Sequence, residues 1–222
     1  IWEEKMTDIK KIIKLDIITV AGYLTLKNFI IITGLGVFYS YLNGNIMPIF
    51  GVSQVFAVIF STYPFLVGDE AGIDSLYGIF GIKRASVVCG RYLWSNLTGI
   101  FYLIFGTALS LILSLTIGKI EFGKEELMVI PVWYLLTNLI IAAQYPFYFR
   151  YGYAKAKLIY TTVIFALVVA GFIIGYFADK VISVFAGVNP YIIIGLALVL
   201  CLAFYLASIK LSKKWYGERE FS

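Results

Sequence analysis

Long uncharged stretches alternate with short charged segments along this sequence. The stretches without Asp, Glu, Lys or Arg cover residues 28–68, 92–118, 127–149, 158–178 and 181–209. A helix needs roughly 20 apolar residues to cross about 30 Å of hydrocarbon, and each stretch is that long. The pattern therefore predicts membrane-spanning helices rather than the strands of a soluble core.

The first stretch, residues 28–68, is long enough for two crossings. Asn43-Gly44-Asn45 followed by Pro48 supplies a turn near its middle. We therefore expect an all-α membrane protein with six transmembrane helices in residues 28–209, and a chain with five spans is the alternative.

The distribution of basic residues predicts the orientation of these spans. Fifteen of the 18 Lys and Arg residues fall in the N-terminal stretch, in segments 68–91 and 150–157, and in the tail 210–222. The other three fall in the alternate segments. Because loops rich in Lys and Arg stay on the cytoplasmic side, both termini are predicted to be cytoplasmic. A chain with five spans would place its two basic termini on opposite sides of the membrane, and the asymmetry of Lys and Arg between the two sides would be lost.

Residues 1–27 carry charges throughout, with Met6 as the expected natural start. We expect an amphipathic helix here that lies in the membrane interface, with Lys10, Lys11 and Lys14 near anionic headgroups. The alternative is a basic flank of the first span. The residues expected near its apolar face are Ile9, Ile13, Ile17, Val20 and Leu24.

Composition removes several kinds of chemistry. The chain is 61% hydrophobic and 14% charged, with a mean hydropathy of +0.90, which excludes a water-soluble domain. It has no His, and Cys89 and Cys201 form no C-x-x-C pair, so neither an imidazole base nor a thiolate metal site is expected. The net charge of +5 is attributed to membrane orientation, so the expected partner is the lipid bilayer and no nucleic acid.

All carboxylates lie outside the expected apolar cores of the spans. Carriers that use a proton gradient usually place ionisable groups at membrane depth, so this chain is expected to take its energy from elsewhere. An intramembrane enzyme is also disfavoured, because the spans contain no paired carboxylates, no His and no Ser–Lys arrangement.

Aromatic and weakly polar side chains stand out within the fourth span. They are candidates for a pathway that suits an amphipathic substrate, and the alternative is that they face lipid or form an interfacial belt. The candidates are Trp133, Tyr134, Asn138 and Gln144.

Small residues recur in the fifth span, where they would let helix backbones approach closely. This face is expected to pack on another helix, either within the chain or across a dimer. The residues are Ala166, Ala170, Gly171 and Gly175.

The connector 68–91 is too apolar for a loop that only contacts solvent. It places four large apolar residues within a charged rim, as a docking surface for a partner requires. The apolar residues are Leu76, Tyr77, Ile79 and Phe80, and the rim consists of Asp69, Glu70, Asp74, Lys83 and Arg84.

Residues 69–93 also resemble a known family. The order of an acidic pair, a short amphipathic stretch, a small turn, a basic pair, an aliphatic pair, Gly, a basic residue, Tyr and Leu is similar to the first cytoplasmic loop of ABC-2-type permeases. The likeness is greatest to the short six-span bacterial group that includes phenol-soluble-modulin exporter permeases. The span layout and the N-terminal helix are similar over the whole chain.

The resemblance implies a permease subunit of an ATP-binding cassette exporter in the bacterial cytoplasmic membrane. The connector would be a coupling helix seated in a groove of a separate cytoplasmic ATPase. Asp69, Glu70 and Asp74 would flank this helix, its apolar residues would enter the groove, and Lys83 and Arg84 would begin the return to span three.

ATP and magnesium would then bind in the partner chain, with no cofactor and no catalytic site in this one. Two permease chains, expected to be identical, would move a hydrophobic or amphipathic substrate such as a cytolytic or antimicrobial peptide. The alternative is the substrate-binding membrane subunit of a vitamin importer that also borrows its ATPase.

Overall fold

The computed structural model describes residues 2–117, 122–162 and 190–219. In these ranges the chain is almost entirely helical, and residues 153–162 are helical after the turn at Gly152. The remaining helices are α1 (Trp2–Ala21), α2 (Leu26–Asn43), α3 (Met47–Glu70), α4 (Ile73–Ile79), α5 (Arg84–Thr116), α6 (Lys124–Tyr151) and α9 (Pro190–Glu218).

The turn expected in the first apolar stretch is present. Helix α2 ends at Asn43, and Gly44 follows in the left-handed conformation with φ of 66°, which glycine adopts without steric cost. The Asn45 side chain accepts a hydrogen bond of 3.1 Å from the backbone N–H of Met47. Pro48 lies in the first turn of α3, where its missing N–H is tolerated. The two helices therefore form a hairpin.

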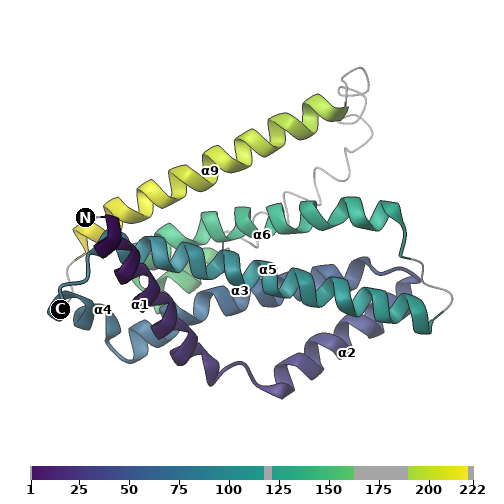
Figure 1. The fold of residues 1–222 in the computed structure, drawn as a ribbon, viewed down its shortest axis with the longest axis horizontal. Coiled ribbons are helices and arrows are strands. Elements are labelled where there is room, and N and C mark those ends of the chain that lie inside the picture. The colour runs from purple at the N-terminus through teal and green to yellow at the C-terminus, as the bar shows by residue number, and fades with distance from the viewer. Residues whose placement is uncertain (1, 118–121, 163–189, 220–222) are drawn as a thin grey trace.

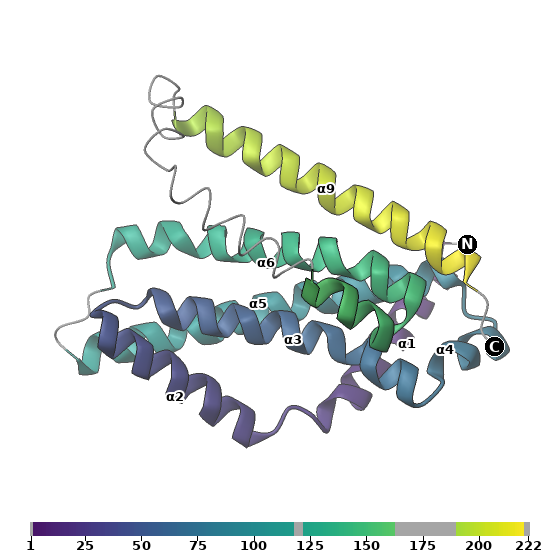
Figure 2. The ribbon, with the colours of Figure 1, turned by 180° about the vertical axis from the view of Figure 1, so that it is seen from behind.

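Helices α3, α5 and α6 form the centre of the bundle (Figure 1). Helix α2 packs on α3, α1 crosses α5 and α3, and α9 lies across α6 and α5. Both ends of the described chain lie at the same end of the bundle as α4, and the reverse view shows the same arrangement (Figure 2). We call this the α4 end. The α2–α3 turn lies at the opposite end, packed near the C-terminal part of α5.

Three helical segments in the described part of the chain are long and apolar enough to cross a membrane, namely α3, α5 and Val129–Tyr151 of α6. A fourth candidate combines Asp8–Ala21 with α2, which are bent by 80° relative to each other. Residues 163–178 of the expected span 158–178 and residues 181–189 of the expected span 181–209 lie outside the described residues, so the count of six stays a prediction. The predicted packing residues Ala166, Ala170, Gly171 and Gly175 also lie outside them.

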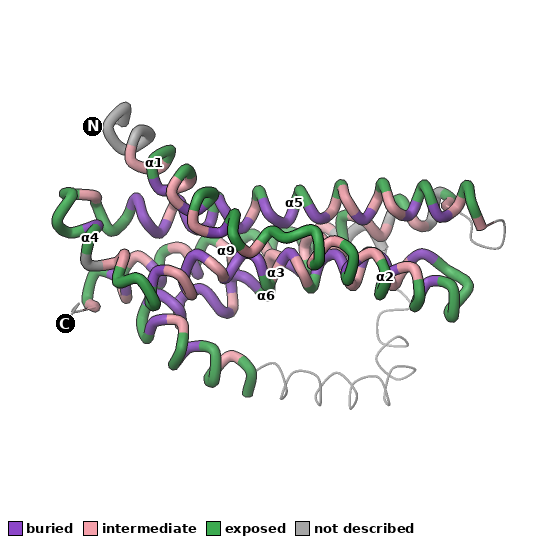
Figure 3. The backbone as a smooth tube through the Cα atoms, turned by 90° about the horizontal axis from the view of Figure 1, so that it is seen from below, coloured by how far each residue is buried: buried purple, intermediate pink, exposed green. Residues whose placement is uncertain are grey.

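Helix α1 packs on the bundle mainly through positions other than the apolar face predicted to lie in the membrane interface. Ile12, Asp16 and Val20 are the fully buried positions, whereas Ile17 and Leu24 are exposed and the helix ends at Ala21. Two features of α5 explain this register. Gly90 leaves room for Ile12, and a buried arginine on α5 pairs with Asp16, as described below. Figure 3 shows the resulting alternation of buried and exposed positions along the helices.

The close approach of α3 and α5 gives a test of this packing. A Cβ atom at Gly106 would lie 2.9 Å from the Ser53 hydroxyl oxygen and 3.2 Å from its Cβ. We expect Gly106→Leu to lower the free energy of unfolding by about 1–3 kcal/mol through overpacking. Gly34→Leu on α2 is the matched control, because no atom lies within 4 Å of a Cβ built there. Thermal unfolding of both variants in detergent measures the difference, and equal stability would contradict the packing.

Candidate functional site

Two glycines determine the shape of α4. Gly72 precedes the helix and Gly81 follows it, both in the left-handed conformation with φ of 63° and 66°. At the C-terminal end, the N–H of Ile82 donates to the Tyr77 carbonyl at 2.9 Å and the N–H of Gly81 to the Gly78 carbonyl at 3.2 Å. This pair of bonds is the Schellman arrangement, which satisfies the last carbonyls of a helix. The sequence therefore forms a short, sharply bounded helix between α3 and α5.

The apolar residues of α4 divide between two faces. Leu76, Ile79 and Phe80 are 42%, 77% and 73% exposed, so they form an apolar outer face on this helix. Tyr77 is only 3% exposed and points into the bundle. The sequence prediction grouped all four as docking residues, and it was wrong for Tyr77. The reason is the helical period, which turns Tyr77 away from its neighbours at 76 and 79.

Tyr77 faces a buried arginine. Arg91 on α5 is 2% exposed, and its Nη2 donates to the Tyr77 hydroxyl at 3.3 Å. Its Nε lies 3.5 Å from Oδ2 of Asp16, which is 1% exposed, and its guanidinium lies 5.0 Å from the centre of the Phe65 ring. Burial raises the pKa of the Tyr77 hydroxyl, so this group stays neutral beside the charged pair. Arg91 therefore joins α1, α3, α4 and α5.

Asp69 holds the start of the helix at residues 153–162. Its Oδ2 accepts hydrogen bonds from the backbone N–H groups of Tyr153 and, at 3.4 Å, Ala154. The first N–H groups of a helix have no partner within it, so this carboxylate acts as a cap supplied from α3. Gly152 has φ of 77°, and a Cβ there would lie 2.8 Å from the Asp69 carboxylate. A glycine is therefore required at this turn.

Asp74 connects α4 to the C-terminal end of α9. Its Oδ1 accepts a hydrogen bond of 3.1 Å from the Tyr216 hydroxyl, and its Oδ2 lies 3.4 Å from Nη1 of Arg219. Nη2 of Arg219 also lies 3.6 Å from Oδ1 of Asp69. One guanidinium thus bridges the end of α3 and the beginning of α4.

Arg84, the first residue of α5, contacts the same end of α9. Its Nη1 donates to the carbonyl oxygens of Tyr216 at 3.2 Å, Gly217 at 2.6 Å and Arg219 at 3.1 Å. The last carbonyls of a helix lack intrahelical partners and carry partial negative charge, so a guanidinium there is favourable. Arg84 therefore fixes where α9 meets α5.

These contacts revise the predicted docking rim. Asp69, Asp74 and Arg84 contact other elements of the chain, and the exposed residues Glu70 and Lys83 lie on either side of α4 in the sequence. The residues that sequence reasoning missed are Asp16, Arg91, Tyr216 and Arg219. Asp16 had a detectable signal, since it lies four residues from both Ile12 and Val20 and so interrupts an apolar stripe.

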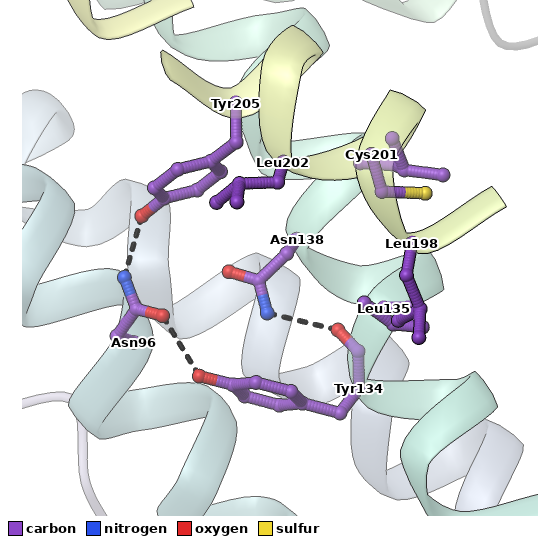
Figure 4. Close-up of a pocket in the computed structure, with 9 residues that line it drawn as sticks. Asn96, Tyr134, Leu135, Asn138, Leu198, Cys201, Leu202 and Tyr205 are labelled. Carbon is purple, nitrogen blue, oxygen red and sulfur yellow. Dashed lines mark hydrogen bonds between the residues drawn. The ribbon is translucent and has the colours of Figure 1, made fainter. Parts of the chain in front are cut away.

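The predicted pathway residues occupy three different places. Tyr134 and Asn138 line a groove of about 370 Å³ between α5, α6 and α9 (Figure 4). In this groove Asn96 of α5 donates to the Tyr205 hydroxyl and accepts from the Tyr134 hydroxyl at 2.8 Å, which ties three helices together. The other lining residues are Leu135, Leu139, Leu198, Cys201 and Leu202.

Trp133 lines a second groove of about 360 Å³, on the α3 side of α6, together with Gln54 and Tyr160. Gln144 lines neither groove, because its side chain is fully buried and its Oε1 lies 3.4 Å from the Tyr148 hydroxyl. The four residues therefore do not form one continuous surface. Neighbouring positions on a helix point in different directions, so a cluster of polar residues in the sequence did not predict a shared lining.

The α4 end thus combines an exposed apolar face with charged contacts that lead into the bundle. Such an arrangement suits the reception of a second protein and the transmission of its movement, rather than bond chemistry. Within the described ranges, no group of three or more His, Cys, Asp or Glu side chains could hold a metal ion.

Comparison with known proteins gives one finding about the family. A family model described as ABC-2 family transporter protein matches residues 11–217, which is nearly the whole chain. No curated protein and no solved structure matches. The matched region includes α4, its contacts with α9 up to Gly217, and both members of the Asp16–Arg91 pair.

The Asp69 cap gives a direct test of this geometry. Asp69→Ala removes the acceptor for the first N–H groups of residues 153–162, and loss of such a cap costs about 0.5–2 kcal/mol. We expect faster hydrogen exchange at Tyr153 and Ala154 and a lower melting temperature. Glu70→Ala, at the exposed neighbouring position, should leave both unchanged. Unaltered exchange in Asp69→Ala would show that the carboxylate does not cap this helix.

Proposed function

The chain belongs to the ABC-2 family of transporter proteins, and we propose that it is the permease subunit of an exporter whose ATPase docks on α4. Members of this family are membrane transport components that work with a cytoplasmic ATPase. The observation that carries the docking proposal is the outer face of α4, where Leu76, Ile79 and Phe80 are exposed beyond the ends of α3 and α5.

The chemistry of this face favours a protein groove as its partner. Full burial of a Leu, Ile or Phe side chain is worth roughly 1.5–3 kcal/mol each, so three such residues can anchor a complex. Glu70 and Lys83 lie beside them and can set the register of docking through charge. The inner face of α4 is already fixed to the bundle, so little conformational freedom is lost on binding.

Energy for transport is proposed to come from ATP and magnesium bound in the partner. For α4 to respond, the nucleotide-bound ATPase must favour one orientation of this helix over another. Moving an equilibrium from 1:99 to 99:1 takes about 5.5 kcal/mol of differential binding. The apolar outer face of α4 is held rigidly next to α3 and α5, so it can transmit a difference in binding free energy of this size to these helices.

The proposed site of action is the bacterial cytoplasmic membrane, with six spans and with both termini and α4 in the cytoplasm. Two observations support this orientation. Lys and Arg are concentrated in alternate segments of the sequence, and the two ends of the described chain lie at the same end of the bundle as α4 (Figure 1). The bend of 80° between α1 and α2 supports the proposal that α1 is an interfacial helix, because α1 does not continue in the direction of α2.

The proposed substrate is hydrophobic or amphipathic, such as a cytolytic or antimicrobial peptide, moved outward by two identical chains. The aromatic and amide groups around the groove in Figure 4 support this class of substrate. Likeness of the α4 connector to phenol-soluble-modulin exporter permeases supports the direction of transport. If the isolated chain instead bound a small vitamin tightly, the vitamin-importer alternative would replace this proposal.

Substitutions on α4 test the docking surface. With an ATPase purified in complex with this chain, we expect Ile79→Asp and Phe80→Asp each to raise the dissociation constant at least about tenfold. The melting temperature of the permease should not change, because both side chains point outward. Titration of labelled permease in detergent with the ATPase measures the affinity.

Leu42→Asp is the matched control for these variants. Leu42 is 62% exposed, similar to the α4 residues, but lies at the end of the bundle with the α2–α3 turn. It should bind the ATPase as the parent does. Parent-like affinity in both α4 variants would refute the docking surface.

A further inference from the structure

Asp16 and Arg91 form an ion pair in which both side chains are almost completely buried. We infer that they are positioning residues that carry a movement of α4 into α1. This inference rests on the proposed docking of an ATPase at α4, and it concerns what happens after docking. The pair itself touches no surface that a partner could reach.

A continuous set of contacts leads from α4 to α1. The Tyr77 hydroxyl lies 3.3 Å from Nη2 of Arg91, and Nε of Arg91 lies 3.5 Å from the Asp16 carboxylate. The Phe65 ring lies against the guanidinium from α3. A Cβ at Gly68 would lie 3.6 Å from Arg91 Nη2 and 3.9 Å from Asp74 Oδ1, so the absence of a side chain there keeps this region uncrowded.

Close packing holds α1 to α5 next to the ion pair. A Cβ at Gly90 would lie only 2.8 Å from Cγ2 of Ile12, so the two helices meet more tightly than any larger residue would allow. Ile12 lies one helical turn before Asp16, and Gly90 directly precedes Arg91. A shift of Arg91 or of Tyr77 must therefore displace α1, and α1 is joined to α2 through the 80° bend.

Stability alone does not account for a buried ion pair at this place. Nε and Nη1 of Arg91 and Oδ2 of Asp16 have no hydrogen-bond partner among the described residues. Removing two charges from water costs more than such a pair returns unless its hydrogen bonds are complete, and an apolar pair of similar size often replaces it without loss. The two charges instead add a directional contact, which only one arrangement of α1, α4 and α5 satisfies.

The remaining contacts of α4 lead elsewhere. Asp74 binds Tyr216 and Arg219, and these residues belong to the C-terminal end of the chain. Arg91 contacts both Tyr77 of α4 and Asp16 of α1. Removing its charge should therefore separate docking of the ATPase from the response of α1, whereas removing the outer face of α4 should abolish docking itself.

The experiment follows the movement of α1 in the complex of permease and ATPase. Spin labels at Lys14 of α1 and Lys155, both exposed, are placed in a background with Cys89 and Cys201 replaced by serine. Their distance is measured by double electron–electron resonance with and without ATP and orthovanadate. The parent is expected to show a nucleotide-dependent shift of this distance.

The Asp16→Leu/Arg91→Met variant should keep its melting temperature and its affinity for the ATPase but lose the shift. Tyr77→Phe should at least halve the shift, because it removes only the hydroxyl that touches Arg91. Tyr102→Phe is the matched control, since the Tyr102 hydroxyl is also buried but has no hydrogen-bond partner among the described residues. It should shift as the parent does.

Several results would overturn the inference. A parent-like shift in the double variant would show that the pair transmits nothing, and an absent shift in the parent would show that α1 does not respond. If the double variant lost stability and ATPase affinity together, the pair would be purely structural. Failure of the docking proposal is distinct, since Phe80→Asp would then bind the ATPase normally.

Discussion

A guanidinium group kept from water at one end of the bundle constrains all the helices around it. Arg91 is charged at any physiological pH, so its burial demands an anion and further polar or aromatic contacts at fixed positions. Asp16 from α1, Tyr77 from α4 and Phe65 from α3 supply them. If any of these helices shifted, a buried charge would lose a partner. The mutual arrangement of four elements therefore follows from one side chain.

This constraint gives α4 two distinct faces. Its inner face is occupied by contacts to Arg91, Tyr216 and Arg219, so its outer apolar face is presented in a fixed direction. A freely moving loop with the same residues could bind a partner but could not pass on a force. Rigidity on one side and exposure on the other are both needed for a helix that converts the movement of a bound protein into a movement of the spans.

The sequence pattern predicted features that depend on neighbouring residues. The turn at Gly44, the helical character and the exposed apolar residues of the connector follow from local composition and period. The pattern did not predict which charges turn inward. Arg84 binds carbonyls more than 130 positions away, and Asp74 meets a tyrosine 142 positions later. When the partner of a charged residue lies so far along the chain, the sequence suggests only that the residue is exposed to solvent beside a span. The contact becomes visible only when α9 is packed on α5.

The contacts of Asp74 and Arg84 with α9 also impose an order of assembly. A ribosome makes α3, α4 and α5 early, but Tyr216 and Arg219 are synthesised near the end of this sequence. Until α9 has been inserted beside α6, the carboxylate of Asp74 and the guanidinium of Arg84 lack these partners. The inner face of α4 is thus completed only after α9 has packed on α5 and α6, so the outer apolar face of α4 takes its fixed orientation no earlier than that step.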